Sequence, residues 1–473
     1  MNGTHTSDHA AGYWHRWWNK QAGGKEVFHL ALPMIISSGS FALMQFADRV
    51  FLTWYNPGAM AAAFSAGQLL WLFASFPFSI MAYTNAFVSQ YNGARQFRKI
   101  GSIIWQGLFL VVLISPLYLL LMPWLDELFG LWHEKAVVKM ESDYLFWLLW
   151  GVTPMLGNEV LSSFFSGRKR TRTVMLVNVS AIALNIVLDY VMIFGWRAIP
   201  SMGLTGAAIA TTISQWLRFG LFFFLTWRVD RRSKGRYHFI RGCRVNFSQQ
   251  RLMLKFGGMG GVQFSIEMAI TAIFILLLGM VGTDAAASSA IAFNLNSLTF
   301  LPILGLGNAA TTLVGNYIGR GQTHLARRST RTSLTIGLFF TTIFMILYFF
   351  FPHLLLAAYF RGNAESIASL NTLTTILLKF VAVYLLFDTG NMIFASALRG
   401  AGDTGFLLLV SIISIPFFTV IPWIGIHYFQ LGIYWCWSIM TGFICVSSVI
   451  FLLRILLSRW EKSFVQADGA ANS

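Results

Sequence analysis

The chain has 473 residues, of which 56% are hydrophobic and only 11% are charged, and its formal net charge is +16. Because soluble domains carry about 25% charged residues, this composition excludes an ordinary soluble protein and indicates a membrane protein. Three cysteines, Cys243, Cys436 and Cys445, are too few and too scattered for a disulfide framework or a zinc site.

The first 26 residues are expected to form a cytoplasmic or interfacial tail. They lack an apolar core followed by a small-residue cleavage site, so no removable signal peptide is evident. The stretch "YWHRWWNKQ" (13–21) mixes aromatic and cationic side chains, as segments at a membrane interface do. A disordered tail is the alternative.

Twelve apolar segments follow, each long enough to span a bilayer as a helix. The short alternating segments of a β-barrel are missing. The predicted spans are 27–52, 60–88, 100–123, 142–166, 174–194, 203–227, 254–280, 286–316, 332–351, 370–397, 406–424 and 430–457. The longest polar connection divides them six and six, which predicts an N-terminal lobe (27–227), a basic linker (228–253), a C-terminal lobe (254–457) and a cytoplasmic tail (458–473).

Two pairs of features indicate that the halves are a repeat. "VSQYNGARQFRKI" (88–100) follows the second span and "VGNYIGRGQTHLARR" (314–328) follows the eighth. Asn158 precedes Gly167 by nine residues in span four, and Asn391 precedes Gly400 by nine in span ten. Parallel repeats around a midplane cavity are a transporter architecture. We therefore expect two pseudo-symmetric six-helix lobes in an all-α polytopic protein.

The basic residues fall on alternate loops, which predicts the orientation. With the N-terminus cytoplasmic, the inward segments hold basic clusters at 95–99, 168–172, 228–255, 320–331 and 454–462. The outward loops hold only Lys135, Lys139, Arg197 and Arg361. This positive-inside pattern predicts a multi-pass protein of the inner (plasma) membrane with both termini cytoplasmic. It also indicates contact with anionic membrane lipids rather than with nucleic acid.

Four carboxylates lie inside the apolar spans. They are Asp48 in span one, Asp189 in span five, Glu267 in span seven and Asp388 in span ten. An ionised carboxylate at mid-membrane depth costs roughly 2.5 to 3.5 kcal/mol, so such residues usually have a function. Sodium prefers several oxygen ligands, and a desolvated carboxylate can bind and release a proton, so either Na⁺ or H⁺ could be coupled to transport.

Polar neighbours share helix faces with these carboxylates. Gln45 lies one turn before Asp48, and helical spacing places Asn178 and Asn185 on the face of Asp189. In span seven, Gln263 and Thr271 flank Glu267 at four-residue steps. Structural roles are the alternative: Asp48 could pair with Arg49, Glu159 could be structural, and Arg218 and Lys379 could extend to the interface.

The aromatic and methionine content suggests a binding cavity for varied apolar cations. Residues within a turn of the carboxylates, together with nearby amides, are the candidates: Phe41, Met44, Gln45, Gln263, Phe264 and Asn391. Pro33 interrupts the hydrogen-bond ladder of span one, as a kink or as a hinge.

Four stretches together resemble the multidrug and toxic compound extrusion (MATE) family, and its NorM-like branch in particular. They are "ALPMIISSGSFALMQFADRVFL" (31–52), "ALNIVLDYVMIFG" (183–195) with "MGLTGAAIATTISQ" (202–215), "QFSIEM" (263–268) and "FDTGNMIFASALRGAGDT" (387–404). The resemblance covers essentially the whole chain. One departure is "SGRKRTRT" after span four, where the family has a glycine-rich turn.

The resemblance implies a V-shaped, two-lobed antiporter that exports amphipathic, often cationic compounds while Na⁺ or H⁺ enters. It implies a cation site in the N-terminal lobe at Asp48, Asn185, Asp189 and Thr211, and one in the C-terminal lobe at Glu267 and Asp388. No cofactor beyond the coupling ion is implied, and a monomer suffices.

Two other function classes remain. A flippase for lipid-linked saccharides on a related fold is the main alternative. A membrane enzyme is disfavoured, because no histidine pair or GxSxG signature is present.

Overall fold

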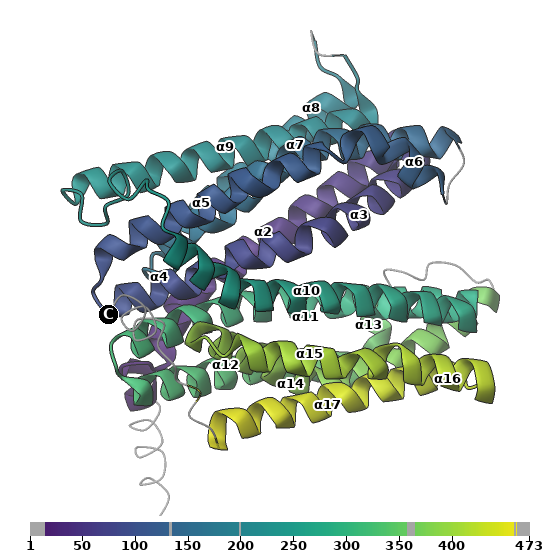
Figure 1. The fold of residues 1–473 in the computed structure, drawn as a ribbon. Coiled ribbons are helices and arrows are strands. Elements are labelled where there is room, and N and C mark those ends of the chain that lie inside the picture. The colour runs from purple at the N-terminus through teal and green to yellow at the C-terminus, as the bar shows by residue number, and fades with distance from the viewer. Residues whose placement is uncertain (1–14, 132–134, 198–199, 357–364, 458–459, 461–473) are drawn as a thin grey trace, which may run out of the picture. The chain divides into compact units, whose positions relative to one another are not determined.

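The structure is a computed structural model, and it describes residues 15–131, 135–197, 200–356, 365–457 and 460. These residues form helices and no β-strand (Figure 1). Residues 15–19 are helical. The helices that follow are α2 (Gly24–Tyr55), α3 (Pro57–Ala82), α4 (Thr84–Gly93), α5 (Phe97–Leu119), η1 (Met122–Trp124), α6 (Leu125–Gly130), α7 (Lys135–Ser166), α8 (Thr171–Phe194), α9 (Gly203–Arg232), α10 (Phe247–Val281), α11 (Thr283–Gly319), α12 (Thr323–Phe350), α13 (Pro352–Leu356), α14 (Glu365–Ala401), α15 (Thr404–Phe418), α16 (Val420–Phe429) and α17 (Ile433–Leu457).

All twelve predicted spans are helical, which confirms the all-α fold class. Eleven helical segments in the described part of the chain are long and apolar enough to cross a membrane. The predicted span 142–166 lies in α7, which is outside that set because Asn158 and Glu159 interrupt its apolar run. Three of these segments are each built from helices in succession: α3 with α4, α5 with η1 and α6, and α15 with α16.

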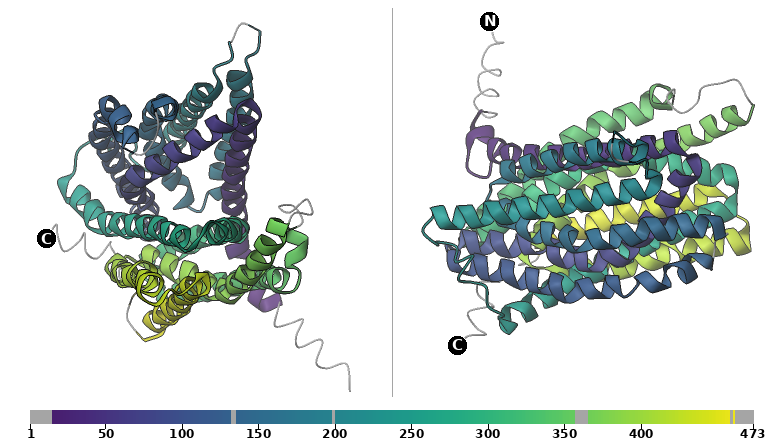
Figure 2. Two further views of the ribbon diagram at one scale, coloured as in Figure 1. Left: turned by 90° about the vertical axis from the view of Figure 1, so that its right-hand side faces the viewer. Right: turned by 90° about the horizontal axis from the view of Figure 1, so that it is seen from above.

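Contacts divide the chain into two compact units, each a bundle of helices that run side by side (Figure 2). Unit 1 comprises residues 1–35 and 266–463, and unit 2 comprises residues 36–265 and 464–473. The chain therefore passes between units inside α2, after Ile35, and inside α10, after Ser265. This division differs from the predicted lobe limits at residues 27 and 254, and those limits stay a prediction. Pro33 lies within α2, and its role as a hinge stays a prediction too.

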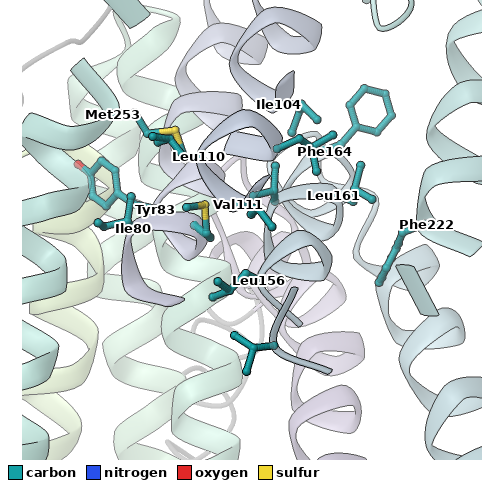
Figure 3. Packing of buried hydrophobic residues seen from close by; sticks show 14 of the residues in the cluster. Ile80, Tyr83, Ile104, Leu110, Val111, Leu156, Leu161, Phe164, Phe222 and Met253 are labelled. Atoms are coloured by element: carbon teal, nitrogen blue, oxygen red, sulfur yellow. The ribbon is translucent and has the colours of Figure 1, made fainter. Parts of the chain in front are cut away.

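Unit 2 has a core of aliphatic and aromatic side chains around α7 (Figure 3). Leu156, Leu161 and Phe164 of α7 are completely buried there. Ile104 of α5 and Phe222 of α9 are equally buried. Because α7 packs on α3, α5 and α9, a polar residue on the packed faces of α7 needs a partner inside the unit.

Unit 1 is held by close contact of small residues between α11 and α14. A Cβ added at Gly400 would lie 2.6 Å from the Thr311 carbonyl oxygen, and one at Gly307 would lie 2.6 Å from the Ser396 hydroxyl oxygen. The Thr311 hydroxyl donates a hydrogen bond of 2.8 Å to the Ser396 carbonyl. Small residues allow such backbone approach, which is how helices associate in lipid.

The two units repeat one packing scheme, as the sequence predicted. The fourth span, α7, packs on the second, third and sixth spans, and the tenth, α14, packs on the eighth, ninth and twelfth. Asn158 donates to the Gln215 carbonyl on α9, and Asn391 donates to the Ile444 carbonyl on α17. A Cβ at Gly167 would meet Val88 of α4, at the end of the second span, as one at Gly400 would meet α11, the eighth span. The paired asparagines therefore join equivalent helices in each half.

Candidate functional site

A pair of carboxyl groups lies inside unit 2, between α2 and α8. Asp48 and Asp189 are within hydrogen-bonding reach of one another. Asp189 is completely buried, and neither of its oxygens accepts a hydrogen bond from a donor among the described residues. A hydrogen bond between the two groups therefore requires a proton on one of them. The predicted pairing of spans one and five is present in this arrangement.

Amide and phenol groups surround this pair. Asn185, one turn before Asp189 on α8, is also fully buried, and neither its side-chain nitrogen nor its oxygen has a partner in the described part of the chain. Tyr144 on α7 interacts electrostatically with both carboxyl groups. Tyr144 was not among the predicted site residues, because an isolated tyrosine near the start of a span resembles an interfacial residue.

Two predicted neighbours of the pair are placed differently. Arg49 forms no ion pair with Asp48 in the described chain, and its guanidinium carbon lies 5.9 Å from the centre of the Phe64 ring. Arg49 still attracts Asp48 electrostatically. Thr211 is half-buried on α9 and has no hydrogen bond to either carboxyl group among the described residues. Its assignment to the cation site stays a prediction.

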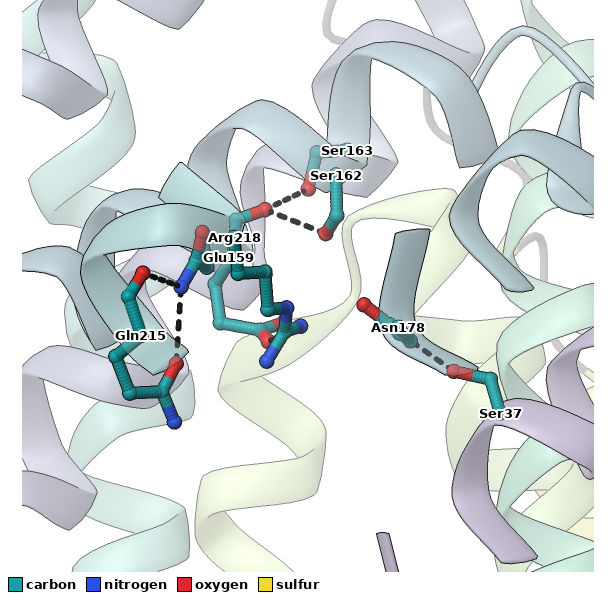
Figure 4. A network of polar contacts seen from close by, with 8 residues as sticks. Ser37, Glu159, Ser162, Ser163, Asn178, Gln215 and Arg218 are labelled. Carbon is teal, nitrogen blue, oxygen red and sulfur yellow. Dashed lines mark hydrogen bonds and ion pairs between the residues drawn. The ribbon is translucent and has the colours of Figure 1, made fainter. Parts of the chain in front are cut away.

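A second polar group in unit 2 joins α7 to α9 (Figure 4). The Glu159 carboxylate lies 3.8 Å from the Arg218 guanidinium, and both side chains are about one fifth to one quarter exposed, at 25% and 18%. Asn158 donates to the Gln215 side-chain oxygen at 3.0 Å. A structural role that extends toward an interface was the alternative for Arg218, and its contact with Glu159 gives it a partner within the bundle.

A third contact in unit 2 joins α8 to α2, as Figure 4 also shows. The Asn178 amide nitrogen donates to the Ser37 hydroxyl at 2.5 Å. Asn178 was predicted to share a face with Asp189, and it uses that face to hold α8 against α2. The contact fixes the two helices that carry Asp48 and Asp189.

Unit 1 contains the other predicted acidic pair. Glu267 on α10 accepts a hydrogen bond of 3.2 Å from the Ser411 hydroxyl of α15. Asp388 on α14 is close enough to Glu267 for electrostatic repulsion. Tyr384, one turn before Asp388, is buried and interacts electrostatically with it. The structure thus brings Glu267 and Asp388 together within one unit, as their sequence stretches suggested.

The predicted cavity residues are spread over three helices. Gln263 is buried on α10 and Asn391 is half-buried on α14, where the Ser447 hydroxyl donates to its side-chain oxygen at 3.2 Å. The others are half-buried: Phe41, Met44 and Gln45 on α2, and Phe264 on α10. Their contribution to a substrate cavity stays a prediction. Among the described residues, no three His, Cys, Asp or Glu side chains are grouped as metal ligands.

Comparison with known proteins agrees with this architecture. The MatE family model matches residues 33–191 and 261–424. A probable multidrug resistance protein NorM from Thermotoga maritima is 28% identical over 445 residues, which cover 93% of this chain and 94% of the relative. The multidrug resistance protein NorM of Burkholderia vietnamiensis is 26% identical, with 82% and 83% covered.

Solved structures show the same fold. An outward-facing multidrug resistance MATE transporter of the MOP superfamily superposes with a TM-score of 0.83 at 18% identity, covering 97% of this chain and 98% of that one. The resemblance to the MATE family and its NorM-like branch is confirmed by the family model and these relatives. The chain therefore belongs to the MatE family of multi-pass membrane transporters and is not an enzyme.

Proposed function

We propose that this transporter is a multidrug efflux antiporter that exports amphipathic, often cationic small molecules in exchange for Na⁺ or H⁺. The relatives named as multidrug resistance proteins support the efflux part of the proposal. The contact between the half-buried Asp48 and the fully buried Asp189 supports the coupling part, and it is the observation that carries the proposal. Alternating access of the two lobes would link the two fluxes.

The chemistry of the pair follows from its surroundings. Two ionised carboxylates in contact repel one another, and the burial of Asp189 weakens the screening of that repulsion, so the pair favours a bound proton or cation. Asn185 adds a carbonyl oxygen that has no other hydrogen-bond partner among the described residues. Oxygen ligands of this kind suit a hard cation, and a protonated carboxyl group would donate to its partner equally well. Loss of the ion would leave uncompensated negative charge that favours a change of conformation.

Glu267 and Asp388 are the alternative coupling site. Ser411 already donates to Glu267, so this pair has one polar partner that the first pair lacks. Mutual repulsion of two acids again favours a bound proton or cation. The experiment below separates the two sites, because each pair can be neutralised alone.

The proposal includes placement in the inner (plasma) membrane, with both termini cytoplasmic. The basic clusters on alternate loops support this orientation. These clusters would contact anionic membrane lipids, and no nucleic-acid partner is proposed. A monomer is proposed, with no cofactor beyond the coupling ion.

The test is dye efflux from reconstituted vesicles under separately imposed Na⁺ and H⁺ gradients. We expect one gradient to drive efflux in the wild type, and we expect Asp48→Asn to reduce that efflux by at least about tenfold, equivalent to about 1.4 kcal/mol of coupling. Asp388→Asn tests the second site under the same gradients. Asp284→Asn is the matched control, because Asp284 is exposed in the first turn of α11.

Three outcomes would count against the proposal. Full activity of both site variants would remove the carboxyl pairs from the mechanism. An equal loss in Asp284→Asn would indicate a general effect on folding. If neither gradient moves dye but the vesicles translocate lipid-linked saccharide, the flippase hypothesis replaces the antiporter hypothesis.

A further inference from the structure

A basic cavity lies in unit 2, where α4 ends and α5 begins and where the loop after α9 folds over them. Its volume is about 610 Å³. Six lysine and arginine side chains line it together with His238, and no acidic residue does. The six are Arg95, Arg98, Lys99, Lys234, Arg236 and Arg241. So many cations around one cavity repel each other, and an anion would remove that repulsion.

The loop that forms one wall is folded rather than a flexible linker. Only residues 233–246 separate α9 from α10. The Trp105 indole donates to the Phe239 carbonyl at 2.5 Å, and the Gly101 amide donates to the Tyr237 carbonyl at 3.0 Å. Gln106 donates to the Arg244 carbonyl at 2.9 Å. The cavity is therefore preformed, so a ligand would not bear the entropy of ordering the loop.

Asp230, the acidic residue next to the cavity wall, already accepts hydrogen bonds from the loop backbone. Both carboxylate oxygens of Asp230 accept backbone hydrogen bonds, from Tyr237 at 2.9 Å and from Phe239 at 3.0 Å. Asp230 is buried, and its charge is directed at the loop backbone. It therefore stabilises the loop and leaves the cations of the cavity uncompensated by this carboxylate.

Arg168 supports the same loop from the turn after α7. Its guanidinium carbon lies 3.9 Å from the centre of the Tyr237 ring, and it donates to the Tyr237 hydroxyl at 2.8 Å. Burial lowers the pKa of Arg168 from its ordinary value, and the interaction with Tyr237 opposes that shift. Tyr237 is thus held from α5, α7 and α9 at once.

Two of these cations lie where the backbone is in the left-handed region. Arg95 and Lys234 have φ of +59° and +54°, in the left-handed region. Each follows the end of a helix at the position where glycine is usual, and a non-glycine residue there costs roughly 1–2 kcal/mol. Strain of this kind is typical of functional sites. Arg236 is positioned as well, 3.9 Å above the Phe97 ring.

We propose that this cavity binds an anion carrying two or more phosphate groups, from a dianionic phospholipid headgroup or from a soluble polyphosphate. One phosphate, with a charge of about −2, would neutralise only part of six cations. A cavity of about 610 Å³ is within the usual size range of small-molecule sites and has room for more than one phosphate. The site is separate from the carboxyl pairs, so it stands or falls independently of the coupling ion.

The test uses the full-length protein and two probes. In detergent, inorganic pyrophosphate is titrated by calorimetry. In nanodiscs of phosphatidylcholine with or without cardiolipin, lipid retention is measured by native mass spectrometry. Pyrophosphate binding would indicate a soluble ligand, and selective retention of cardiolipin would indicate a lipid. The double variant Arg98→Gln with Arg241→Gln removes two exposed cations of the cavity and should weaken binding at least about tenfold.

Two variants make the result specific. Arg328→Gln with Arg331→Gln removes the same charge from α12 in unit 1 and should change binding less than about twofold. Arg98→Lys with Arg241→Lys keeps the charge but loses the planar guanidinium fork, so its binding should lie between that of the wild type and that of the glutamine variant. If neither probe binds the wild type, the proposal is overturned. Equal losses in the cavity and α12 variants, or full loss in the lysine variant, would also overturn it.

Discussion

Gly101 on α5 is the position where one added methyl group should detach the loop after α9. A Cβ at this residue would lie 2.3 Å from the Tyr237 carbonyl oxygen and 2.7 Å from the His238 carbonyl carbon. Both are backbone atoms, so neither can rotate away as a side chain could. The loop itself has to move, and the hydrogen bond from the Gly101 amide to the Tyr237 carbonyl is lost with it.

The expected cost of Gly101→Ala is about 2 to 4 kcal/mol. Overpacking against fixed atoms typically costs about 1 to 3 kcal/mol. The lost Gly101 hydrogen bond adds about 1 kcal/mol, and the Trp105 bond to Phe239 weakens with the same displacement. A cost near 3 kcal/mol raises the population of the open loop by roughly 100-fold, since each 1.4 kcal/mol is a factor of ten.

Chymotrypsin cleavage after Tyr237 or Phe239 measures this opening. Both side chains are buried in the closed loop, at 8% and 1% exposure, so cleavage reports the open population when reclosing is fast. We expect cleavage at least about tenfold faster in Gly101→Ala. Gly220→Ala on α9 is the control, because a Cβ there meets nothing within 4 Å. Unchanged cleavage in Gly101→Ala, or equal acceleration in the control, would refute the geometry.

Three further variants test other contacts, each by thermal unfolding in one detergent unless stated. Glu159→Gln removes the charged partner of Arg218 and should lower the free energy of unfolding by about 2 to 3 kcal/mol, which is less than for a fully buried pair. Adding Arg218→Met should restore most of this loss. If the double variant shows no recovery, the ion pair is not the cause. Gly400→Ala places a Cβ 2.6 Å from the Thr311 carbonyl oxygen and should cost about 1 to 3 kcal/mol, whereas an unchanged melting temperature would show that α11 and α14 can separate freely. Glu26→Gln weakens the hydrogen bonds that the Glu26 carboxylate accepts from the Ala22 amide (2.9 Å) and the Tyr317 hydroxyl (2.6 Å), and it should speed hydrogen exchange at the start of α2 about tenfold. Equal protection in the variant would show that these bonds do not hold the start of α2.

Several features follow from the sequence alone. The class of protein and the helical spans are local properties, because twenty apolar residues in lipid must satisfy their own backbone hydrogen bonds. The internal repeat could also be predicted, since Asn158 precedes Gly167 and Asn391 precedes Gly400 by the same nine residues in the sequence. Their contacts with equivalent helices confirm that reading.

Other features were decided only by the tertiary structure. Helical spacing fixes which residues share a face, but the rotation of one helix against another decides which faces meet. The contact between Arg218 on α9 and Glu159 on α7 therefore could not be predicted from the sequence. The basic cavity could not be predicted for the same reason, because its lining residues come from two segments, 95–99 and 234–241, that are far apart in the chain. A carboxylate in an apolar span can be identified as a candidate site residue from the sequence, because its burial in the membrane costs free energy. Which carboxylates form pairs depends on how the helices pack.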